Sequence, residues 1–191
     1  MNFDMEVSDA IRNRRAVREY VDQPVREETV RALIEAATLA PSAVNGQPWA
    51  FVVVQDRDLL KKISDRSKLL MLHADYPAHI SSMIADPAFN IFYNAGTLIV
   101  ICAKPGGEHS DWDCCLAGEN LMLAARDMGL GTCTIGLAWP ALELSEIKSE
   151  LGIPAGYEAI LPIIVGYPTD FPASSGRKEA EILSWKRPPE E

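Results

Sequence analysis

Three short apolar segments that alternate with amphipathic segments predict a single domain of the α/β or α+β class. The apolar segments, residues 49–55, 97–102 and 159–166, are rich in β-branched side chains and have the length of buried strands. The segments between them carry apolar residues at helical spacing. A chain of 191 residues that is 48% hydrophobic can bury a sizeable core, so we expect residues 1–191 to form one domain.

The balance of charge favours a small-molecule function. The formal net charge is -9 and the sequence pI is about 4.9, so the chain as a whole would repel nucleic acids and anionic membranes. Residues 1–6 are acidic and lack the apolar segment of a signal peptide, and no apolar run approaches the length that spans a membrane. We therefore expect a cytoplasmic protein that binds neither nucleic acid nor membrane.

The cysteines and histidines do not predict a metal site. The four cysteines lack the CxxC spacing of zinc sites, and the three histidines are not at ligand spacing with them. These residues are Cys102, Cys114, Cys115, Cys133, His73, His79 and His109. The adjacent Cys114 and Cys115 could form a redox couple, but cysteines in an apolar helical segment more often serve as small core residues.

The N-terminal segment predicts a helix rich in arginine. Ser8 has the character of a helix N-cap, and we expect the following helix to carry Arg12, Arg14, Arg15 and Arg18. Arg14 and Arg18 are four residues apart and would share one face, with Arg15 beside them. Two interpretations stay open. The segment is either a solvated flank that pairs with nearby carboxylates or a phosphate clamp, because guanidinium groups match phosphate oxygens at any pH.

The loop over residues 40–49 is the strongest candidate for ligand recognition. It follows an amphipathic helix expected over residues 24–40 and precedes the first strand. Two prolines stiffen the loop, while Ser42, Asn45 and Gln47 offer hydroxyl and amide groups that can read the edge of a flat heterocycle. The alternative interpretation is an ordinary polar turn.

The middle of the chain predicts two further helices. One is expected over residues 56–72, and a central buried helix is expected over residues 113–128, which are apolar on nearly every face. Between them the helical signal weakens over residues 73–92. Pro77 and Pro87 break the pattern there and favour a loop-rich excursion.

The last third of the chain begins with a glycine-rich connection over residues 130–136. Its backbone can approach a ligand closely, although it has neither a Walker pattern nor a clean GxGxxG. A short helix is expected over residues 142–151, and Pro162 in the third strand favours a sheet edge or a bulge. Residues 167–191 are poor in core residues, so this tail would fray on a monomer but could stay ordered along a partner subunit.

Taken together, three motifs resemble the FMN-dependent nitroreductase family. They are residues 14–18 (RRAVR), 40–49 (APSAVNGQPW) and 129–136 (GLGTCTIG), with a GYP sequence at 166–168, and the similarity runs from about residue 11 to residue 185. The resemblance implies an α+β fold with a central mixed β-sheet flanked by helices. It also implies a homodimer that exchanges its C-terminal arms, residues 167–191, and shares two FMN sites at the subunit interface.

The resemblance implies which residues bind FMN. Those expected at the phosphate and ribityl chain are Arg14, Arg15, Ala16 and Arg18, and those expected at the flavin of the partner subunit are Pro41, Ser42, Ala43, Asn45 and Gln47. Those expected to line the isoalloxazine are Thr134, Ile135 and Gly136, with Asn90 at its pyrimidine edge and Arg177 or Lys178 returning to the phosphate. Two positions depart from the family pattern, since Ala16 stands where Ser is common and Glu119 where Gln is common.

The activity implied by the resemblance needs no protein nucleophile. FMN would take a hydride from NADH or NADPH, and a nitroaromatic, a quinone or a similar small oxidant would then use the same face of the ring. We therefore expect no catalytic side chain and no metal. The alternatives are a flavin- or nucleotide-binding module without turnover, and a family member with another flavin reaction such as reductive dehalogenation or flavin breakdown.

Overall fold

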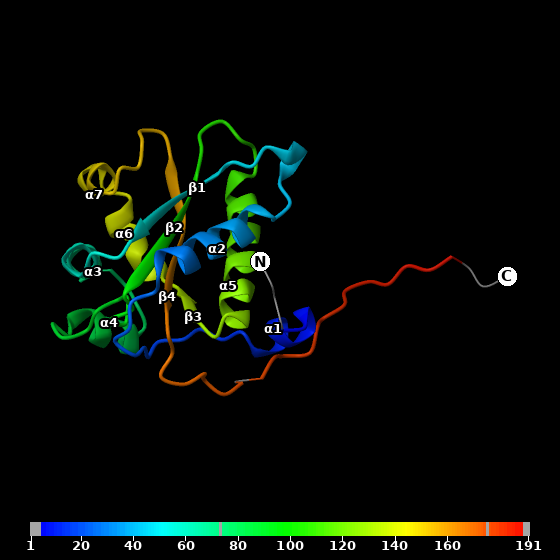
Figure 1. The fold of residues 1–191 in the computed structure, drawn as a ribbon, viewed down its shortest axis with the longest axis horizontal. Coiled ribbons are helices and arrows are strands. Elements are labelled where there is room, and N and C mark those ends of the chain that lie inside the picture. The colour runs from blue at the N-terminus through cyan, green and yellow to red at the C-terminus, as the bar shows by residue number, and fades with distance from the viewer. Residues whose placement is uncertain (1–4, 73, 175, 189–191) are drawn as a thin grey trace.

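A four-stranded antiparallel sheet forms the centre of the part of the chain that the computed structural model describes, residues 5–72, 74–174 and 176–188 (Figure 1). Its strands, in spatial order, are β1 (Trp49–Val54), β2 (Thr97–Ala103), β4 (Glu158–Gly166) and β3 (Gly131–Thr134). Each neighbouring pair runs antiparallel. Helices cover both faces of this sheet, which confirms the α+β class. The sheet is not mixed as we expected, because parallel pairing within the described residues is confined to an isolated bridge between Ala16 and Thr132.

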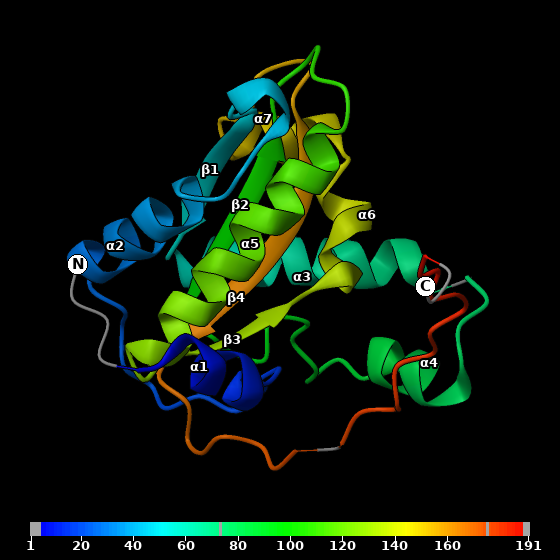
Figure 2. The ribbon, with the colours of Figure 1, turned by 90° about the vertical axis from the view of Figure 1, so that its right-hand side faces the viewer.

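Helices cover the two faces of the sheet in separate layers (Figure 2). One face packs against α2 (Glu27–Thr38) and α5 (Ser110–Asp127), and the other packs against α3 (Arg57–Met71), α6 (Trp139–Leu142) and α7 (Ser145–Glu150). These helices agree with the amphipathic segments of the sequence, except that α7 is shorter than the helix expected over residues 142–151 and that α6, just before it, was not expected. Asp56 begins α3, where its side chain accepts the N–H groups of Asp58 and Leu59.

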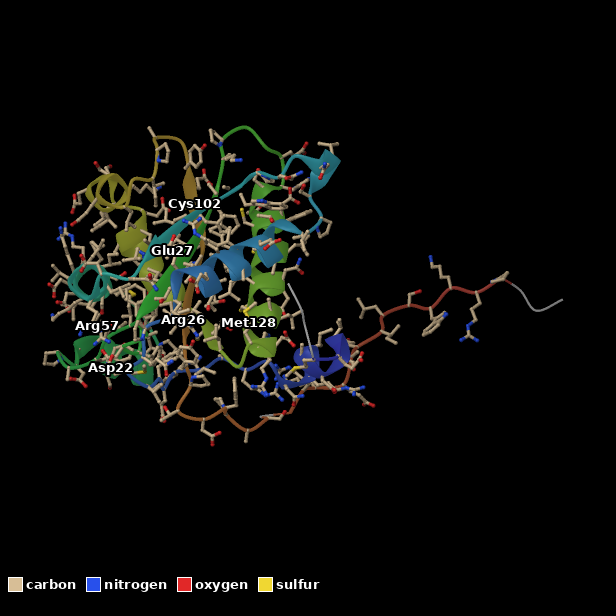
Figure 3. All side chains as sticks on the ribbon, in the orientation of Figure 1. Asp22, Arg26, Glu27, Arg57, Cys102 and Met128 are labelled. Carbon is tan, nitrogen blue, oxygen red and sulfur yellow. The ribbon has the colours of Figure 1, made fainter. Side chains whose placement is uncertain are left out.

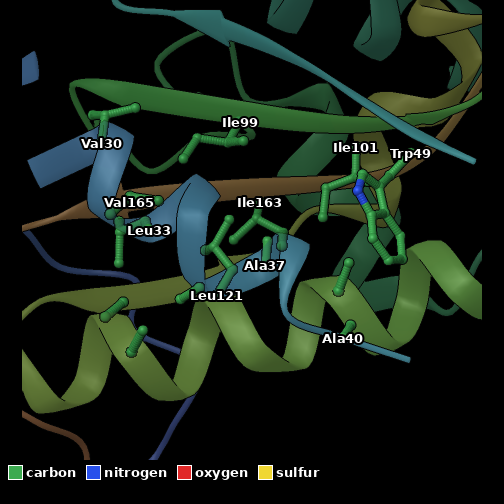
Figure 4. Packing of buried hydrophobic residues seen from close by; sticks show 14 of the residues in the cluster. Val30, Leu33, Ala37, Ala40, Trp49, Ile99, Ile101, Leu121, Ile163 and Val165 are labelled. Atoms are coloured by element: carbon green, nitrogen blue, oxygen red, sulfur yellow. The ribbon is translucent and has the colours of Figure 1, made fainter. Parts of the chain in front are cut away.

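The core is divided between these two faces by the alternation of the β2 side chains. Ile99 and Ile101 point toward α2 and α5 (Figure 4), whereas Leu98 and Val100 belong to the cluster on the opposite face. All of β2 is buried, because it lies inside the sheet with a helical layer on each side. Burial of each such side chain contributes about 1.5–3 kcal/mol to folding.

The arginine-rich segment is not the continuous helix that we expected. Helix α1 (Val7–Asn13) ends just before Arg14, whose backbone is extended. Val17 instead donates its N–H to the carbonyl of Thr132 at 2.9 Å, beside the parallel bridge. Gly131 permits this approach, because a Cβ atom there would lie 2.8 Å from the Val17 side chain. Pairing with the edge of the sheet therefore overrides local helix formation, and Arg14 and Arg18 do not share a helical face.

Two further segments differ from the sequence interpretation. The loop-rich excursion contains α4 (Ala78–Ala85), because Pro77 stands at its N-cap and Pro87 lies beyond its end, so the prolines flank the helix. The amino group of Lys68 donates to the carbonyls of Asp86 and Phe89, each at 2.7 Å, and fastens the chain after α4 to α3. His73 lies outside the described residues.

The glycine-rich connection includes β3. The point at which β3 ends explains how β4 accommodates Pro162. Strand β4 lies inside the sheet, where a proline would remove a ladder hydrogen bond. The Pro162 carbonyl accepts the N–H of Ile135, just past the end of β3. In an antiparallel strand the N and C=O of one residue face the same neighbour, so the Pro162 nitrogen also faces the place where β3 has ended. A register shift lies nearby, between Ile101 and Cys102 of β2.

Ion pairs and a cation–π contact fasten the connecting segments to the helices. Arg57, at the start of α3, pairs with Asp22 on the segment between α1 and α2 (Figure 3). At the start of the tail, the guanidinium carbon of Arg126 lies 3.6 Å from the centre of the Phe171 ring. Beyond Phe171 the described tail has no helix or strand and extends away from the body (Figure 1).

Some sequence predictions fall on residues that the structure does not describe. Residues 1–4, 175 and 189–191 are among these residues. The exchange of a C-terminal arm between subunits remains a prediction. Among the described helices, none is long and apolar enough to cross a membrane. In the same residues, no group of three or more His, Cys, Asp or Glu side chains is arranged to hold a metal ion.

Candidate functional site

Two arginines of the first motif lie beside β3. The Arg14 Nε atom is 3.3 Å from a carboxylate oxygen of Glu119 on α5, and its side chain is three-quarters buried. The guanidinium carbon of Arg18 lies 5.7 Å from the centre of the Tyr93 ring. Burial raises the pKa of the Cys133 thiol on β3, and the positive charges of Arg18 and Arg14 oppose that rise. Both guanidinium charges therefore act on this strand.

Arg15 has a different environment and an unused donor. Its Nη1 group donates to the carbonyls of Arg12 and Arg14, each at 2.7 Å, and so satisfies the chain where α1 ends. Its Nε atom is buried and has no hydrogen-bond partner in the described part of the chain. A buried guanidinium donor without an acceptor is costly. An anionic group bound at this segment would satisfy it, which fits the phosphate-clamp interpretation of the segment better than the solvated flank.

The turn after β3 provides an open wall next to these arginines. Thr134 is exposed at the end of β3, and its hydroxyl lies 3.9 Å from the Met122 sulfur on α5. Gly136 is exposed, and a Cβ atom added to it would meet nothing within 4 Å. Since Met122 and Glu119 are neighbours on α5, the structure brings Arg14 and the Thr134–Gly136 turn to one side of this helix.

The recognition loop is rigidly organised at the other end of α5. The buried carboxylate of Asp113 accepts the N–H of Ala43, with distances of 3.3 and 3.2 Å to its two oxygens. Val44, Asn45 and Gln47 all have positive φ angles, of 46°, 57° and 46°. This conformation costs free energy for a β-branched residue such as Val44 and indicates that surrounding contacts hold the loop in place.

Hydrogen bonds inside the loop leave part of its recognition chemistry free. The Ser42 hydroxyl accepts the Gln47 N–H at 3.0 Å, and the Gln47 side-chain amide donates to the Asn45 oxygen at 3.1 Å. The Asn45 amide nitrogen and the Gln47 side-chain oxygen make no hydrogen bond to another described residue, and both side chains are exposed, like Pro41. The loop therefore presents one donor group and one acceptor group side by side.

Helix α5 separates this loop from the arginines within one chain. The loop contacts α5 at Asp113, and Arg14 contacts it at Glu119, six residues later. Six residues correspond to about 9 Å along a helix and to faces about 120° apart. Figure 1 shows the loop near the N-terminal end of α5 and α1, which precedes Arg14, near its C-terminal end. A single subunit does not bring these two groups of predicted site residues together.

The remaining predicted residues are placed less decisively. Asn90 is half-buried, and its side-chain oxygen accepts the N–H of Phe92 at 2.9 Å, next to the Tyr93 ring that contacts Arg18. Arg177 and Lys178 are exposed on the tail, and Arg177 donates to the carbonyl of the adjacent Gly176 at 2.8 Å. The structure does not bring the tail residues to the arginine segment, so their role at a phosphate remains a prediction.

Sequence reasoning missed Asp113 as part of the site. The helix dipole favours an acidic residue in the first turn of a helix. A buried acidic residue nearly always has a partner, so Asp113 in an otherwise apolar helix could have indicated a contact such as the one with Ala43. Glu119, which departs from the family pattern, pairs with Arg14 in the structure.

Comparison with known proteins identifies the family. The model of the nitroreductase family matches residues 11–167. A protein of Archaeoglobus fulgidus described as a candidate NADH dehydrogenase/NAD(P)H nitroreductase is 34% identical over 165 residues, which are 84% of each chain. This chain belongs to the nitroreductase family.

Other members of the nitroreductase family show its fold and its range of activities. The crystal structure of a nitroreductase from Bacteroides fragilis with bound FMN matches 95% of this chain and 98% of its own, with a TM-score of 0.79 and 25% identity. An iodotyrosine deiodinase of Thermotoga neapolitana is 26% identical over 184 residues, which cover 91% of this chain and 95% of that protein. Membership of the family therefore does not by itself fix the reaction.

Proposed function

We propose that this chain is an FMN-dependent NAD(P)H oxidoreductase that reduces nitroaromatics, quinones or similar small oxidants. The observation that carries this proposal is the buried Arg15 Nε donor, which lacks an acceptor among the described residues, in an arginine segment that pairs with β3 at Ala16. The FMN-bound relative of the same fold and the NAD(P)H nitroreductase description of the archaeal relative support it.

The residues of the chain fit the parts of FMN. The guanidinium groups of Arg14, Arg15 and Arg18 suit a terminal phosphate, because they keep their charge at any pH and present several donors. Gly136 leaves room for a flat ring against the backbone. When bound, FMN supplies hydride transfer from the nicotinamide donor to the oxidant, and the protein supplies position and electrostatics.

We propose further that the functional unit is a homodimer with shared sites. In this arrangement Ser42, Asn45 and Gln47 of one subunit reach the cofactor bound by Arg14 of the other. The separation of these residues by α5 within one chain supports the arrangement. The rigid loop with its unused donor and acceptor also supports it, since such groups are expected to face a ligand.

No thiol of the chain is assigned a catalytic role. Burial raises the pKa of Cys102 to about 11 and that of Cys114 to about 12. Burial likewise raises the pKa of Cys115 and of Cys133. These thiols stay protonated at neutral pH, and a protonated thiol is a poor nucleophile.

A second candidate function is reductive dehalogenation, which the resemblance to an iodotyrosine deiodinase favours. The same arginine segment and turn would serve that reaction. Release of iodide from an iodinated aromatic substrate by the reduced enzyme, at a rate above that of nitroarene reduction, would favour this candidate. A binding module without turnover would hold FMN and oxidise neither NADH nor NADPH.

The test of the main proposal is spectroscopic. The purified protein is expected to show the visible absorption of a flavin, to release FMN on denaturation, and to lose its colour on addition of NADH or NADPH. Addition of a quinone or a nitroarene should restore the colour. A colourless protein that cannot be reconstituted with FMN would contradict the proposal.

A further inference from the structure

A hollow of about 840 Å³ lies between the N-terminal half of α5, helices α6 and α7, and the start of β4. This volume is within the range of small-molecule sites. Its lining includes an indole, a phenol, a thiol and several charged groups, contributed by Asp111, Cys115, Trp139, Lys148, Tyr157 and Glu158. The residues assigned to FMN do not include any of these side chains.

Trp139 gives the hollow a fixed aromatic face. Its indole N–H donates to the carbonyl of Ile160 at 3.2 Å, which restrains the ring, and yet the residue is 52% exposed. A large aromatic side chain that is held in place and left half open to solvent can stack against a flat ligand with little loss of conformational freedom.

The hollow adjoins the turn that is proposed to face the flavin. Trp139 follows Gly136 by three residues, and Leu161 precedes Pro162, whose carbonyl accepts the Ile135 N–H at 2.9 Å. Leu161 also packs directly on Gly118 of α5, where a Cβ atom would be 2.2 Å from its terminal carbon. Since Gly118 is next to Glu119, residues of the hollow and Arg14 contact the same helix, α5.

The charges that line the hollow are unbalanced toward negative. The amino group of Lys148 lies 3.1 Å from a carboxylate oxygen of Glu143, and this ion pair neutralises the positive charge of Lys148. Asp111 and Glu158 form no ion pair with any described cation. An anionic ligand in the hollow would therefore be repelled, whereas a cationic one would be attracted by the carboxylates and by the negative face of the indole.

We propose that this hollow binds flat aromatic molecules of positive or neutral charge, which stack on the face of Trp139. The hollow thereby selects cationic over anionic oxidants. This inference rests on the proposed oxidoreductase function and names the class of oxidant that the enzyme would prefer. Binding itself, however, can be measured without turnover.

The binding test uses three ligands of one shape and different charge. Benzyltrimethylammonium, benzyl alcohol and benzoate are titrated into the purified holoenzyme in a calorimeter. The cation should bind more tightly than the alcohol, and benzoate most weakly. Trp139→Ala should weaken binding of the cation by about threefold to thirtyfold, the range that corresponds to an indole–cation contact. Trp139→Phe should retain part of the affinity.

A matched control keeps this test specific to the hollow. Trp112→Ala removes another exposed indole, which stacks on His109 at 4.2 Å outside the hollow. This variant should bind the cation as the unchanged protein does. Equal losses in the Trp139 and Trp112 variants, or tightest binding of benzoate, would overturn the proposal.

Charge is tested separately, with turnover as the second readout. Nitrobenzyl derivatives that carry a trimethylammonium, a hydroxyl or a carboxylate group are compared as oxidants by kcat/KM. Asp111→Asn combined with Glu158→Gln should lower the cation-to-anion ratio by about twofold to tenfold at low salt. Glu108→Gln, a solvent-exposed carboxylate outside the hollow, should not change it. Reduction of all three oxidants without charge preference would overturn this inference alone, and reduction of none would overturn the proposed function.

Discussion

The carboxylate of Asp113 on α5 accepts the backbone N–H of Ala43, at the point where the recognition loop takes up left-handed backbone angles. The two residues are 70 positions apart in the chain. This contact joins the most characteristic loop of the sequence to the central helix. It also places the loop on a different face of α5 from Arg14, which is the arrangement that the proposed shared site requires.

Asp113→Ala should therefore weaken FMN binding even though Asp113 lies far from the arginine cluster. Removal of the acceptor leaves the Ala43 N–H without its partner and releases a strained loop, which we expect to cost about 1–3 kcal/mol. Asp113→Asn keeps an acceptor oxygen and should lose less. FMN fluorescence titration measures both effects, with Glu108→Ala, an exposed carboxylate near the same end of α5, as the control.

Mixed dimers test whether the loop acts across the interface. A dimer of one Arg14→Ala subunit and one Asp113→Ala subunit contains one site with both groups intact if sites are shared. Such a preparation should bind FMN tightly at about half of its sites, whereas each parent variant should bind weakly throughout. Weak binding at every site of the mixed dimer would show that loop and arginine act in the same chain.

Arg14→Ala should lower FMN affinity more directly. Loss of one charged hydrogen bond to a phosphate corresponds to about 1.5–3 kcal/mol, or roughly a tenfold to hundredfold increase in Kd. Arg12→Ala is the matched control, since Arg12 is exposed on α1 and is 3.9 Å from Asp9. Equal FMN affinity in the Arg14 variant and the unchanged protein would favour the interpretation that this segment is a solvated flank.

Much of the fold could be predicted from sequence because its signals are local. The apolar stripe of α2, the Asp56 cap of α3 and the β-branched run of β1 are each encoded within a few neighbouring residues. The arginine segment does not form the helix that its sequence predicts, because its conformation depends on a contact distant in the chain. Val17 pairs with Thr132, and a partner so distant in the chain cannot be read from local spacing.

The site was predictable in its residue types and not in its contacts. The composition of the loop with Asn45 and Gln47 indicates recognition, whereas the hydrogen bond that Asp113 accepts from Ala43 and the ion pair between Glu119 and Arg14 depend on tertiary packing. Local pattern does not predict α4, because Pro77 and Pro87 interrupt the helical spacing, although they stand at its two ends. Position relative to the helix decides what a proline does.

Truncation of the tail before Pro172 should remove both the dimer and the FMN. The described tail beyond Phe171 is exposed, with apolar side chains such as Ile182, Leu183 and Trp185 in solvent, so a partner surface is the expected place for them. Sedimentation and the flavin spectrum measure the two losses together. A chain that ends at Arg187 is the control and should retain both. A truncated monomer that still holds FMN stoichiometrically would contradict the shared-site proposal.

The last prediction concerns stability at alkaline pH and follows from the buried thiols. Burial raises the pKa of Cys114 from 9.0 to about 12 in the folded protein. Above pH 9 the unfolded chain therefore releases this proton first and binds fewer protons than the folded state, so the free energy of unfolding falls as pH rises. The stabilising contribution is complete below pH 9 and is lost progressively toward pH 12.

A single substitution isolates this thiol from the other titrating groups. The slope contributed by one such group is at most about 1.4 kcal/mol per pH unit. Cys114→Ala should lower stability at pH 7, because it leaves a small cavity, but its stability should fall less steeply between pH 9 and pH 11 than that of the unchanged protein. Urea unfolding at several pH values measures both curves. Parallel curves over this interval would show that Cys114 does not titrate differently in the folded and unfolded states.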